Sequence, residues 1–327
     1  MKHSRAAFMS RRRFLASAST VGAGAWISPH RLVGHVTEWP NVALGEDGPV
    51  QQFRRTAATA SVEVQRLRGR ASLITGSGCN VAAFATDDGV LLVDSGIVSS
   101  KVAAAVAKVS GTPVRHVVNT HWHFDHTDGN DWLHARGAIV IAHENTRRHL
   151  SVDTRVEDWF HFTFPASPAG ALPSTVITDA HTLRLNASLA VLTAYTPAHT
   201  DSDLSVHFTD ADVLCVGDTW WNGVYPFIDY ATGGSIDGMI RAAEESLSRA
   251  GADTIILPGH GNPGGKGDVS RFKDMLTAIR DRVAKLKAQR LTVAEVVAAR
   301  PSADFDAAWG GWVIRPDFFV SLVYKGL

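Results

Sequence analysis

Residues 121–126, with the sequence HWHFDH, constrain this chain more than any other stretch because they place three imidazoles and a carboxylate in one short segment. In an extended segment His121 and His123 point to one side, while Asp125 and His126 turn away into the next element. Imidazole and carboxylate groups are common ligands of divalent metals. The cluster therefore predicts a metal site, and its two directions predict two neighbouring ions.

Further candidate ligands follow apolar, strand-like runs elsewhere in the chain. They are His199 after Pro197-Ala198, Asp218 after Gly217, and His260 after Pro258-Gly259. The apolar run Val114–Val118 likewise predicts a buried strand just before the histidine cluster. Ligands at the ends of buried strands are held rigidly, so we expect the separate segments to meet at one rim of a sheet.

The order of these motifs, H-x-H-x-D-H, a separate His, a Gly-Asp and a Pro-Gly-His, resembles the metallo-β-lactamase superfamily over roughly residues 60 to 265. The resemblance implies two groups of ligands around a shared carboxylate: His121, His123 and His199 for one ion, Asp125, His126 and His260 for the other, and Asp218 as the bridge. It also implies that Asp94 fixes the loop below the site without touching a metal.

The fold class expected from this resemblance is α/β, a four-layer αβ/βα sandwich with two mixed sheets packed face to face and helices outside. Apolar residues recur at helical spacing over residues 98–109, which predicts a helix that leads into the strand Val114–Val118. A similar order of strands, helix and strand follows in the second half. Two αβ halves with the metals at one rim fit this order.

The alternative interpretation of the histidines is structural, since the chain has fifteen of them. We prefer that interpretation for the histidines outside the motifs, namely His116, His134, His149, His181 and His207. For the seven motif residues each residue type and its context suits a metal-binding loop, so we retain them as ligands.

Composition limits the classes of function that remain. Lys and Arg together number 32, equal to Asp and Glu, so no net positive field favours nucleic acid, and a small-molecule substrate is expected. The two cysteines, Cys79 and Cys215, exclude a disulfide framework. Nothing in the sequence predicts an oligomeric state.

The N-terminal sequence Ser10-Arg11-Arg12-Arg13-Phe14-Leu15, followed by a mild apolar stretch, resembles a twin-arginine export signal over residues 1–30. The apolar stretch is shorter than the roughly 20 residues that a membrane-spanning helix needs. We therefore expect a periplasmic or secreted protein that meets the membrane only through the export machinery. A basic tail without a targeting role is the alternative.

The rest of the chain divides into a loose, turn-rich lead-in over residues 31–60 and one domain over residues 61–327. Residues 157–172 lack periodicity and predict an aromatic loop, which either lines a substrate site or packs over the core. A helical cap is expected from about residue 268 to the C-terminus.

Large apolar rings follow Asp218 at once in the sequence WWNGVYPF. We predict a substrate wall from Trp220, Trp221, Tyr225 and Phe227, with plain core packing as the equal alternative.

The expected activity is exported, metal-dependent hydrolysis of an ester, lactone, thioester or amide by a metal-bridging hydroxide. Asp125 would orient the hydroxide and move its proton, and Asp218 would keep the two divalent metals together. Nitrogen and oxygen ligands without a thiolate favour zinc, with iron or manganese as alternatives.

Three other functions stay open. The first is hydrolysis of β-lactams, although the cysteine ligand of some β-lactamases is absent. The second is a single-iron persulfide dioxygenase, which generally leaves the second metal position empty. The third is a non-catalytic metal-binding protein, for which a missing ligand would be the expected trace.

Overall fold

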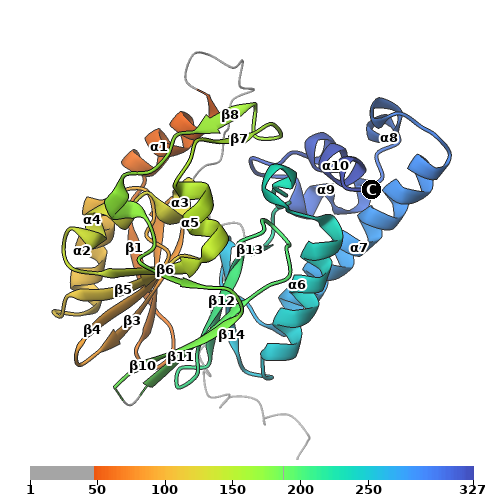
Figure 1. The fold of residues 1–327 in the computed structure, drawn as a ribbon. Helices are drawn as coiled ribbons and strands as arrows, with labels where there is room; N and C mark the ends of the chain where they lie inside the picture. Colours follow the sequence, from red (N-terminus) through yellow and green to blue (C-terminus); the bar gives the residue numbers. More distant parts are fainter. Residues whose placement is uncertain (1–47, 187) are drawn as a thin grey trace, which may run out of the picture.

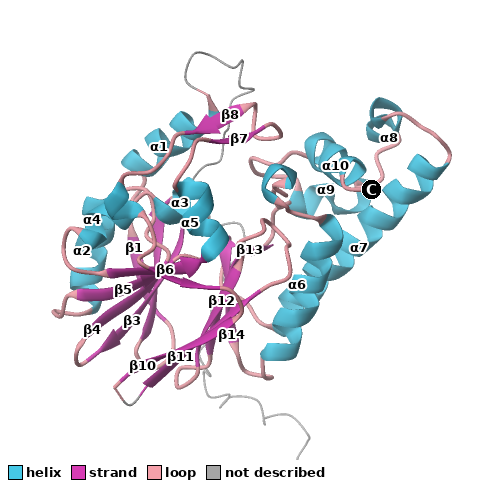
Figure 2. Ribbon diagram, viewed as in Figure 1, coloured by secondary structure: helices cyan, strands magenta, loops and turns pink. Residues whose placement is uncertain are grey.

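The computed structural model describes residues 48–186 and 188–327. The predicted export signal and the first part of the lead-in lie outside these residues. The described chain forms two large sheets that pack against each other, with helices on their outer faces (Figures 1 and 2). This is the predicted four-layer α/β arrangement.

The first sheet has seven strands, and its first four pair antiparallel while the last four pair parallel. In spatial order they are β1 (Glu63–Arg66), β2 (Ala71–Ser77), β3 (Cys79–Thr86), β4 (Gly89–Val93), β5 (Val114–Val118), β6 (Ile139–His143) and β9 (Thr175–Ile177). The predicted strand before the histidine cluster is β5. Its bounds are confirmed.

The second sheet has five strands, all antiparallel except for the last pair. They are β10 (Ala180–Leu185), β11 (Ser188–Ala194), β12 (Leu204–Phe208), β13 (Val213–Trp221) and β14 (Ile255–His260). The two sheets meet through buried apolar side chains, and the rings of Phe84 and Phe208 stack with centroids 4.7 Å apart. Burial of both inner faces explains the apolar runs in the sequence.

Helices cover the outer face of the first sheet and the loops at its rim. They are α2 (Ser99–Val109), α3 (Phe124–Thr127), α4 (Asn130–His134) and α5 (Glu144–Leu150). Helix α2 confirms the helix predicted over residues 98–109, and it buries Val102 and Val106 against the strands. The periodic apolar stripe is therefore the face that packs on the sheet.

The second sheet is covered by α6 (Ile236–Arg249) and α7 (Lys266–Ala288). Ser235 caps α6, because its hydroxyl accepts a hydrogen bond from the Gly238 amide. Three further helices follow: α8 (Val293–Ala298), α9 (Ala303–Trp309) and α10 (Pro316–Lys325). These helices confirm that the C-terminal segment is helical, and α10 packs on α7 and α8.

Two segments differ from the expectations. Residues 49–59 form a helix, α1 (Pro49–Thr59), and not a loose lead-in. Its buried residues Val50, Phe53 and Ala57 recur at helical spacing, and Val50 and Phe53 belong to the largest apolar cluster, so packing stabilises this helix. Residues 157–172 are not simply a loop, because β8 (Phe162–Phe164) pairs with β7 (Thr154–Val156) as an antiparallel ribbon. A short 3₁₀ turn, η2 (Ala169–Ala171), follows.

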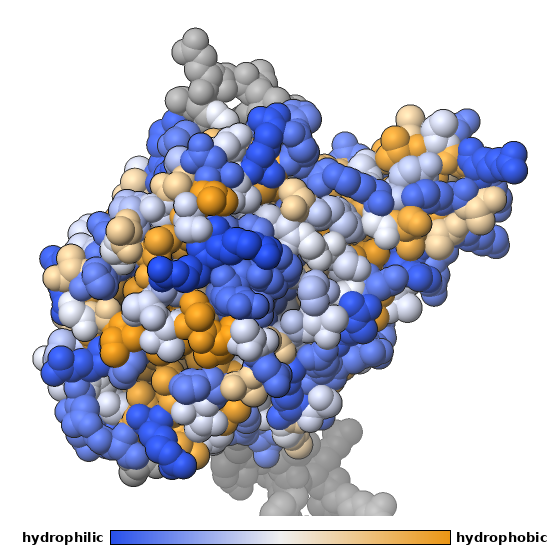
Figure 3. Space-filling model, viewed as in Figure 1, coloured by the Kyte–Doolittle hydropathy of each residue, from blue (hydrophilic) through white to orange (hydrophobic). Residues whose placement is uncertain are grey.

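Hydrophilic residues cover much of the face seen in Figure 3, with hydrophobic residues between them. Within the described ranges, no helix is long and apolar enough to cross a membrane. Cys79 and Cys215 are both free and buried, as expected for a chain without a disulfide framework.

Candidate metal centre

The histidine cluster begins three residues after β5, where the chain leaves the first sheet and enters α3. His121 and His126 are fully buried, and Asp125 is 5% exposed. His123 precedes α3, while Asp125 and His126 lie within it. This change from extended backbone to helix sends the side chains in two directions, as the spacing predicted.

The other ligands come from three places in the second half of the fold. His199 lies in the loop between β11 and β12, Asp218 lies within β13, and His260 ends β14. Gly259 permits their close approach, since a Cβ atom there would lie 1.8 Å from Asp218 Oδ1. The glycine of the Pro-Gly-His motif is therefore required by geometry.

Asp218 lies between imidazoles from both predicted ligand groups. Its Oδ2 is 3.8 Å from His121 Nε2 and 3.5 Å from His199 Nε2. Its Oδ1 is 3.3 Å from His126 Nε2, and its Oδ2 is 3.4 Å from His260 Nε2. A carboxylate in this position is placed to bridge two ions.

The candidate ligand atoms form two groups, each with its atoms within 4.8 Å of one another: His121, His123, His199 and Asp218 in one, and Asp125, His126 and His260 in the other. Asp125 Oδ2 is 3.5 Å from His126 Nε2 and 3.3 Å from His260 Nε2. The structure thus brings together all seven residues predicted from the sequence.

A further observation that fits divalent ions is that several buried polar atoms of the cluster have no hydrogen-bond partner among the described residues. His121 Nε2, His126 Nε2 and Asp218 Oδ1 are buried and have no hydrogen-bond partner among the described residues. Burying such atoms without a partner is costly, so each such atom calls for an explanation. Coordination of a metal would satisfy all three at once.

The cluster shifts the pKa values of its own members. Burial alone raises the pKa of Asp218, but the neighbouring imidazoles, led by His260, hold it well below its usual range. Burial alone lowers the pKa of His260, and the carboxylates of Asp218 and Asp125 raise it to about 9. Burial lowers the pKa of His199 to about 4. Metal binding must therefore displace a proton from His260 at neutral pH.

Asp94 anchors the loop that carries the histidine cluster, as the resemblance implied. Its Oδ1 accepts a hydrogen bond from the Thr120 amide at 2.7 Å, and its Oδ2 pairs with His126 Nδ1 at 2.8 Å. Cys79 also lies beside this pair. Burial raises the pKa of Cys79 to about 12, so its thiol is protonated in the absence of a metal.

Two further positioning groups were not predicted. Asp229 Oδ2 pairs with His123 Nε2 at 3.0 Å, and the Phe227 carbonyl oxygen pairs with His199 Nδ1 at 2.9 Å. These contacts leave His123 Nδ1 and His199 Nε2 facing each other, 2.9 Å apart. Asp229 is separated from its partner by 106 residues. No local pattern in the sequence therefore marks Asp229. Asp203, in contrast, accepts a hydrogen bond from the His199 amide and lies only four residues from His199.

A narrow cavity of about 30 Å³ opens onto the centre, and five of the seven candidate ligands line it. Its other walls are apolar and come from α1, α3, the β7–β8 segment, β13 and the loop after it: Phe53, Phe124, Val156, Trp159, Phe164, Trp221 and Phe227. We call this cavity the aromatic pocket.

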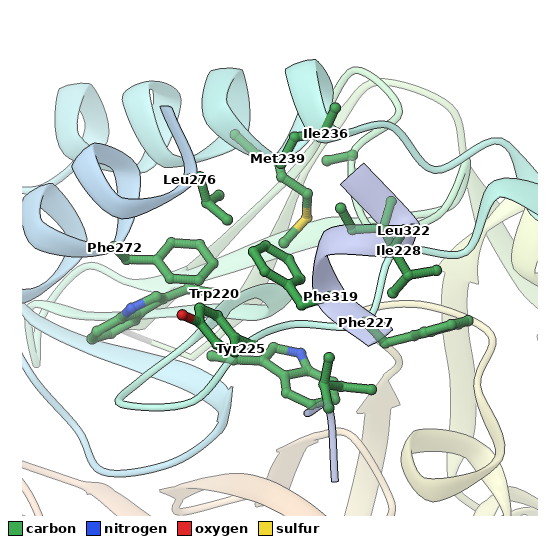
Figure 4. Close-up of a cluster of buried hydrophobic side chains, with 14 of the residues drawn as sticks. Trp220, Tyr225, Phe227, Ile228, Ile236, Met239, Phe272, Leu276, Phe319 and Leu322 are labelled. Atoms are coloured by element: carbon green, nitrogen blue, oxygen red, sulfur yellow. The ribbon is translucent and has the colours of Figure 1, made fainter. Parts of the chain in front are cut away.

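Two of the four residues predicted to form a substrate wall lie beside the centre, and their role toward a substrate stays a prediction. Trp221 and Phe227 line the aromatic pocket, whereas Trp220 and Tyr225 do not. Figure 4 shows Trp220 and Tyr225 among the buried apolar side chains of the core. The Tyr225 ring stacks on Phe319 with centroids 4.6 Å apart, so its role is packing.

A second and larger cavity, of about 570 Å³, reaches the centre at His260. It lies between α1, the β2–β3 hairpin and the loop after β14, and it shares Phe53 with the aromatic pocket. We call it the wide cavity. Gly76 and Gly78, at the turn of this hairpin, line the cavity.

Comparison with known proteins identifies the family. The model of the metallo-beta-lactamase superfamily matches residues 74–260, which is more than half of the chain. The chain belongs to the metallo-beta-lactamase superfamily.

Two curated relatives are named as hydrolases. Hydroxyacylglutathione hydrolase of Polaromonas sp. (strain JS666 / ATCC BAA-500) is 29% identical over 158 residues, or 48% of this chain and 52% of that protein. Probable metallo-hydrolase YqgX of Bacillus subtilis (strain 168) is 25% identical over 191 residues, or 56% and 84%. The match thus spans about half the length of the first relative.

Solved structures share the fold at low sequence identity. DIM-1 metallo-beta-lactamase has a TM-score of 0.54 at 20% identity, with 66% of this chain and 97% of that chain covered. The sec-alkylsulfatase Pisa1 from Pseudomonas sp. has a TM-score of 0.62 at 15% identity, with 81% and 50% covered. These likenesses show the fold, and the assignment to the superfamily rests on the match over residues 74–260.

Proposed function

We propose that this protein is an exported hydrolase that uses two divalent metal ions to cleave an ester, lactone, thioester or amide bond of a small molecule. The position of Asp218 carries the proposal. Its two carboxylate oxygens lie 3.3–3.8 Å from imidazoles of both ligand groups. A carboxylate that lies between both ligand groups, together with a complete second group of Asp125, His126 and His260, supports two ions over one.

The residues would divide into holding and proton-moving roles. His121, His123 and His199 would hold one ion, Asp125, His126 and His260 the other, and Asp218 would bridge them. When bound, two such ions lower the pKa of a shared water and polarise the electrophile. Asp125 would orient that water through one oxygen and accept its proton there. Burial alone raises the Asp125 pKa, but His126 and His260 lower it below the usual range, so the carboxylate is available as a base.

Zinc is our choice of metal, with iron and manganese as alternatives. The candidate ligands are imidazoles and carboxylates, and their partners Asp94 and Asp229 orient the rings. Such carboxylate–histidine pairs raise ligand basicity and fix the tautomer in zinc sites. The seven predicted ligands include no thiolate. Iron and manganese, which also accept nitrogen and oxygen ligands, therefore remain alternatives.

The test is turnover by purified, metal-loaded protein on a panel of chromogenic esters, lactones, thioesters, amides and β-lactams. We expect hydrolysis in at least one of the first four classes and its loss on chelation. A β-lactam as the preferred substrate would favour the lactamase alternative. Sulfur oxidation of a persulfide with one bound iron would refute the hydrolase assignment, and tight metal binding without any turnover would favour a binding protein.

Export is a separate part of the proposal, and it is supported by the Arg-rich N-terminal sequence. We expect Arg11→Lys combined with Arg12→Lys to retain the protein inside the cell, since lysine does not reproduce paired guanidinium recognition. Fractionation measures this, with Arg5→Lys, outside the motif, as the control. If the double variant still reaches the periplasm in a strain with only the twin-arginine route, the export proposal is wrong.

A further inference from the structure

The two cavities that reach the metal centre share an electrostatic property. Among the described residues, neither the aromatic pocket nor the wide cavity is lined by a lysine or an arginine. Apart from the metal ligands, the one charged residue that residues 48–186 and 188–327 place on these walls is Glu63, in the wide cavity. In the described part of the chain, both routes to the centre therefore lack a cationic group that could pair with a substrate anion.

Cationic side chains do lie near these cavities, but protein groups already bind them. Arg54 stacks on Phe124 and makes two hydrogen bonds to Asp128, at 2.9 and 3.1 Å. Lys101 donates to the carbonyl oxygens of Ala57 and Ala60, at the C-terminal end of α1. These charges serve to hold the walls in place.

A third cation is bound in the same way near the mouth of the aromatic pocket. Lys325 of α10 donates to both oxygens of Asp158, at 2.8 and 2.6 Å. Asp158 precedes Trp159, whose ring lines the pocket and packs on Phe227 with centroids 4.9 Å apart. This ion pair joins the C-terminal cap to the β7–β8 segment, and its ammonium group is neutralised.

A substrate carboxylate in the aromatic pocket would lose water without gaining a charged partner, unless it reached the metals themselves. Desolvating an ionised carboxylate without a partner is strongly unfavourable. An apolar group in the aromatic pocket, in contrast, gains by leaving water and by contact with the rings. The walls thus favour substrates that are neutral away from the reacting bond.

We propose that the substrate class of this centre is a neutral ester or lactone with a small apolar group seated in the aromatic pocket. Acyl compounds with a remote carboxylate, such as thioesters of glutathione with its two carboxylates, are then poor substrates. This inference rests on the proposed hydrolase function. The proposed substrate class differs from the glutathione thioester that the name of the Polaromonas relative, hydroxyacylglutathione hydrolase, indicates.

The experiment compares two para-nitrophenyl esters on the metal-loaded protein. One is the mono-ester of adipic acid, which keeps a free carboxylate, and the other carries an isopropyl group in place of that carboxylate. We expect kcat/KM to be at least about tenfold higher for the neutral ester, equivalent to about 1.4 kcal/mol. S-lactoylglutathione should rank below the neutral ester as well.

A substitution at Phe53, which lines both cavities, tests the physical cause. Phe53→Lys should raise the ratio of kcat/KM for the anionic ester to that for the neutral ester about tenfold. Gln52→Lys is the matched control, because it adds the same charge to the same helix at a position that lines neither cavity. That variant should leave the ratio within about twofold of the native protein.

The possible outcomes distinguish a failure of the neutral-substrate inference from a failure of the proposed hydrolase function. Equal or faster hydrolysis of the anionic ester by the native protein would overturn the neutral-substrate class and leave the hydrolase function intact. A shift in Gln52→Lys as large as in Phe53→Lys would overturn the role of the cavity walls. No turnover of any ester, lactone, thioester or amide would overturn the proposed function and this inference with it.

Discussion

The metal centre and the aromatic pocket beside it are built in different ways. Ligands of the centre lie at or near the ends of buried strands, and hydrogen bonds to the carboxylates of Asp94 and Asp229 fix two of their rings. Much of the pocket comes from segments outside the two sheets, including α1 and the β7–β8 ribbon. We therefore expect the chemistry to depend on the two sheets and substrate choice to depend on the segments around them.

This difference predicts different effects of mutation. A change in the centre alters metal binding and lowers turnover of every substrate, because all substrates meet the same reacting groups. A change in the pocket alters which substrate is preferred and leaves the metal content unchanged. Substitutions in the two regions therefore test whether metal binding and substrate preference are separable.

The largest effect is expected for Gly259→Ala. The new Cβ would lie 1.8 Å from Asp218 Oδ1, so the bridging carboxylate must move. Displacement of a reacting group by about 1 Å can cost about a hundredfold in rate, and we expect at least this loss of kcat on all substrates. Metal analysis and steady-state kinetics on one preparation measure it. Gly111→Ala is the control, since nothing lies within 4 Å of a Cβ there. Unchanged kcat in Gly259→Ala would contradict the proposed geometry.

A smaller effect on the same region is expected for Asp229→Asn. Asparagine preserves the shape but directs an amide donor at His123 Nε2, which opposes the tautomer that leaves Nδ1 free for a metal. We expect metal affinity to fall about 10- to 100-fold, as measured by competition with a chelator. Asp237→Asn, on α6, is the matched control because Asp237 pairs with Arg280 and not with a ligand. Native affinity in Asp229→Asn would show that this carboxylate only supports the loop.

The smallest effect is expected in the pocket. Trp159→Leu removes a ring that packs on Phe227, and such aromatic pairs contribute about 0.5–1.5 kcal/mol. We expect KM for a neutral, apolar ester to rise several-fold, with two metals still bound and kcat nearly unchanged. Trp132→Leu, where the ring packs under Arg136 outside the pocket, controls for loss of a tryptophan. Loss of metal from Trp159→Leu would erase the distinction between centre and pocket.

Much of the centre could be predicted because its ligands lie in short, recognisable motifs. The helix over residues 98–109 also carries clear periodicity, because it buries one apolar face, and the strand Val114–Val118 is marked by its apolar run, in which Val117 and Val118 are buried on opposite faces. Asp229 could not be predicted in the same way. It reaches His123 only after the two halves of the chain pack together, and residues that contact across 106 positions leave no local signal.

The pocket was harder to predict for physical reasons that Trp220 and Trp221 illustrate. Strand β13 continues through both of them, but its pairing with β14 shifts register between Cys215 and Trp221. Alternation along the strand therefore cannot be counted from Asp218, and the sequence alone does not tell which ring faces the core. Helix α1 was missed because only a few of its residues, such as Val50 and Phe53, are apolar enough to mark a face.

The metal content of the native protein and of Asp218→Ala tests the central claim most directly. The account predicts two divalent ions per native chain and close to one in the variant. Loss of the bridge leaves His121, His123 and His199 for one ion, and removes a carboxylate from the other. Activity should fall by orders of magnitude in the same preparation. A native protein that binds one ion, or a variant that keeps two ions and near-native turnover, would contradict a centre bridged by Asp218.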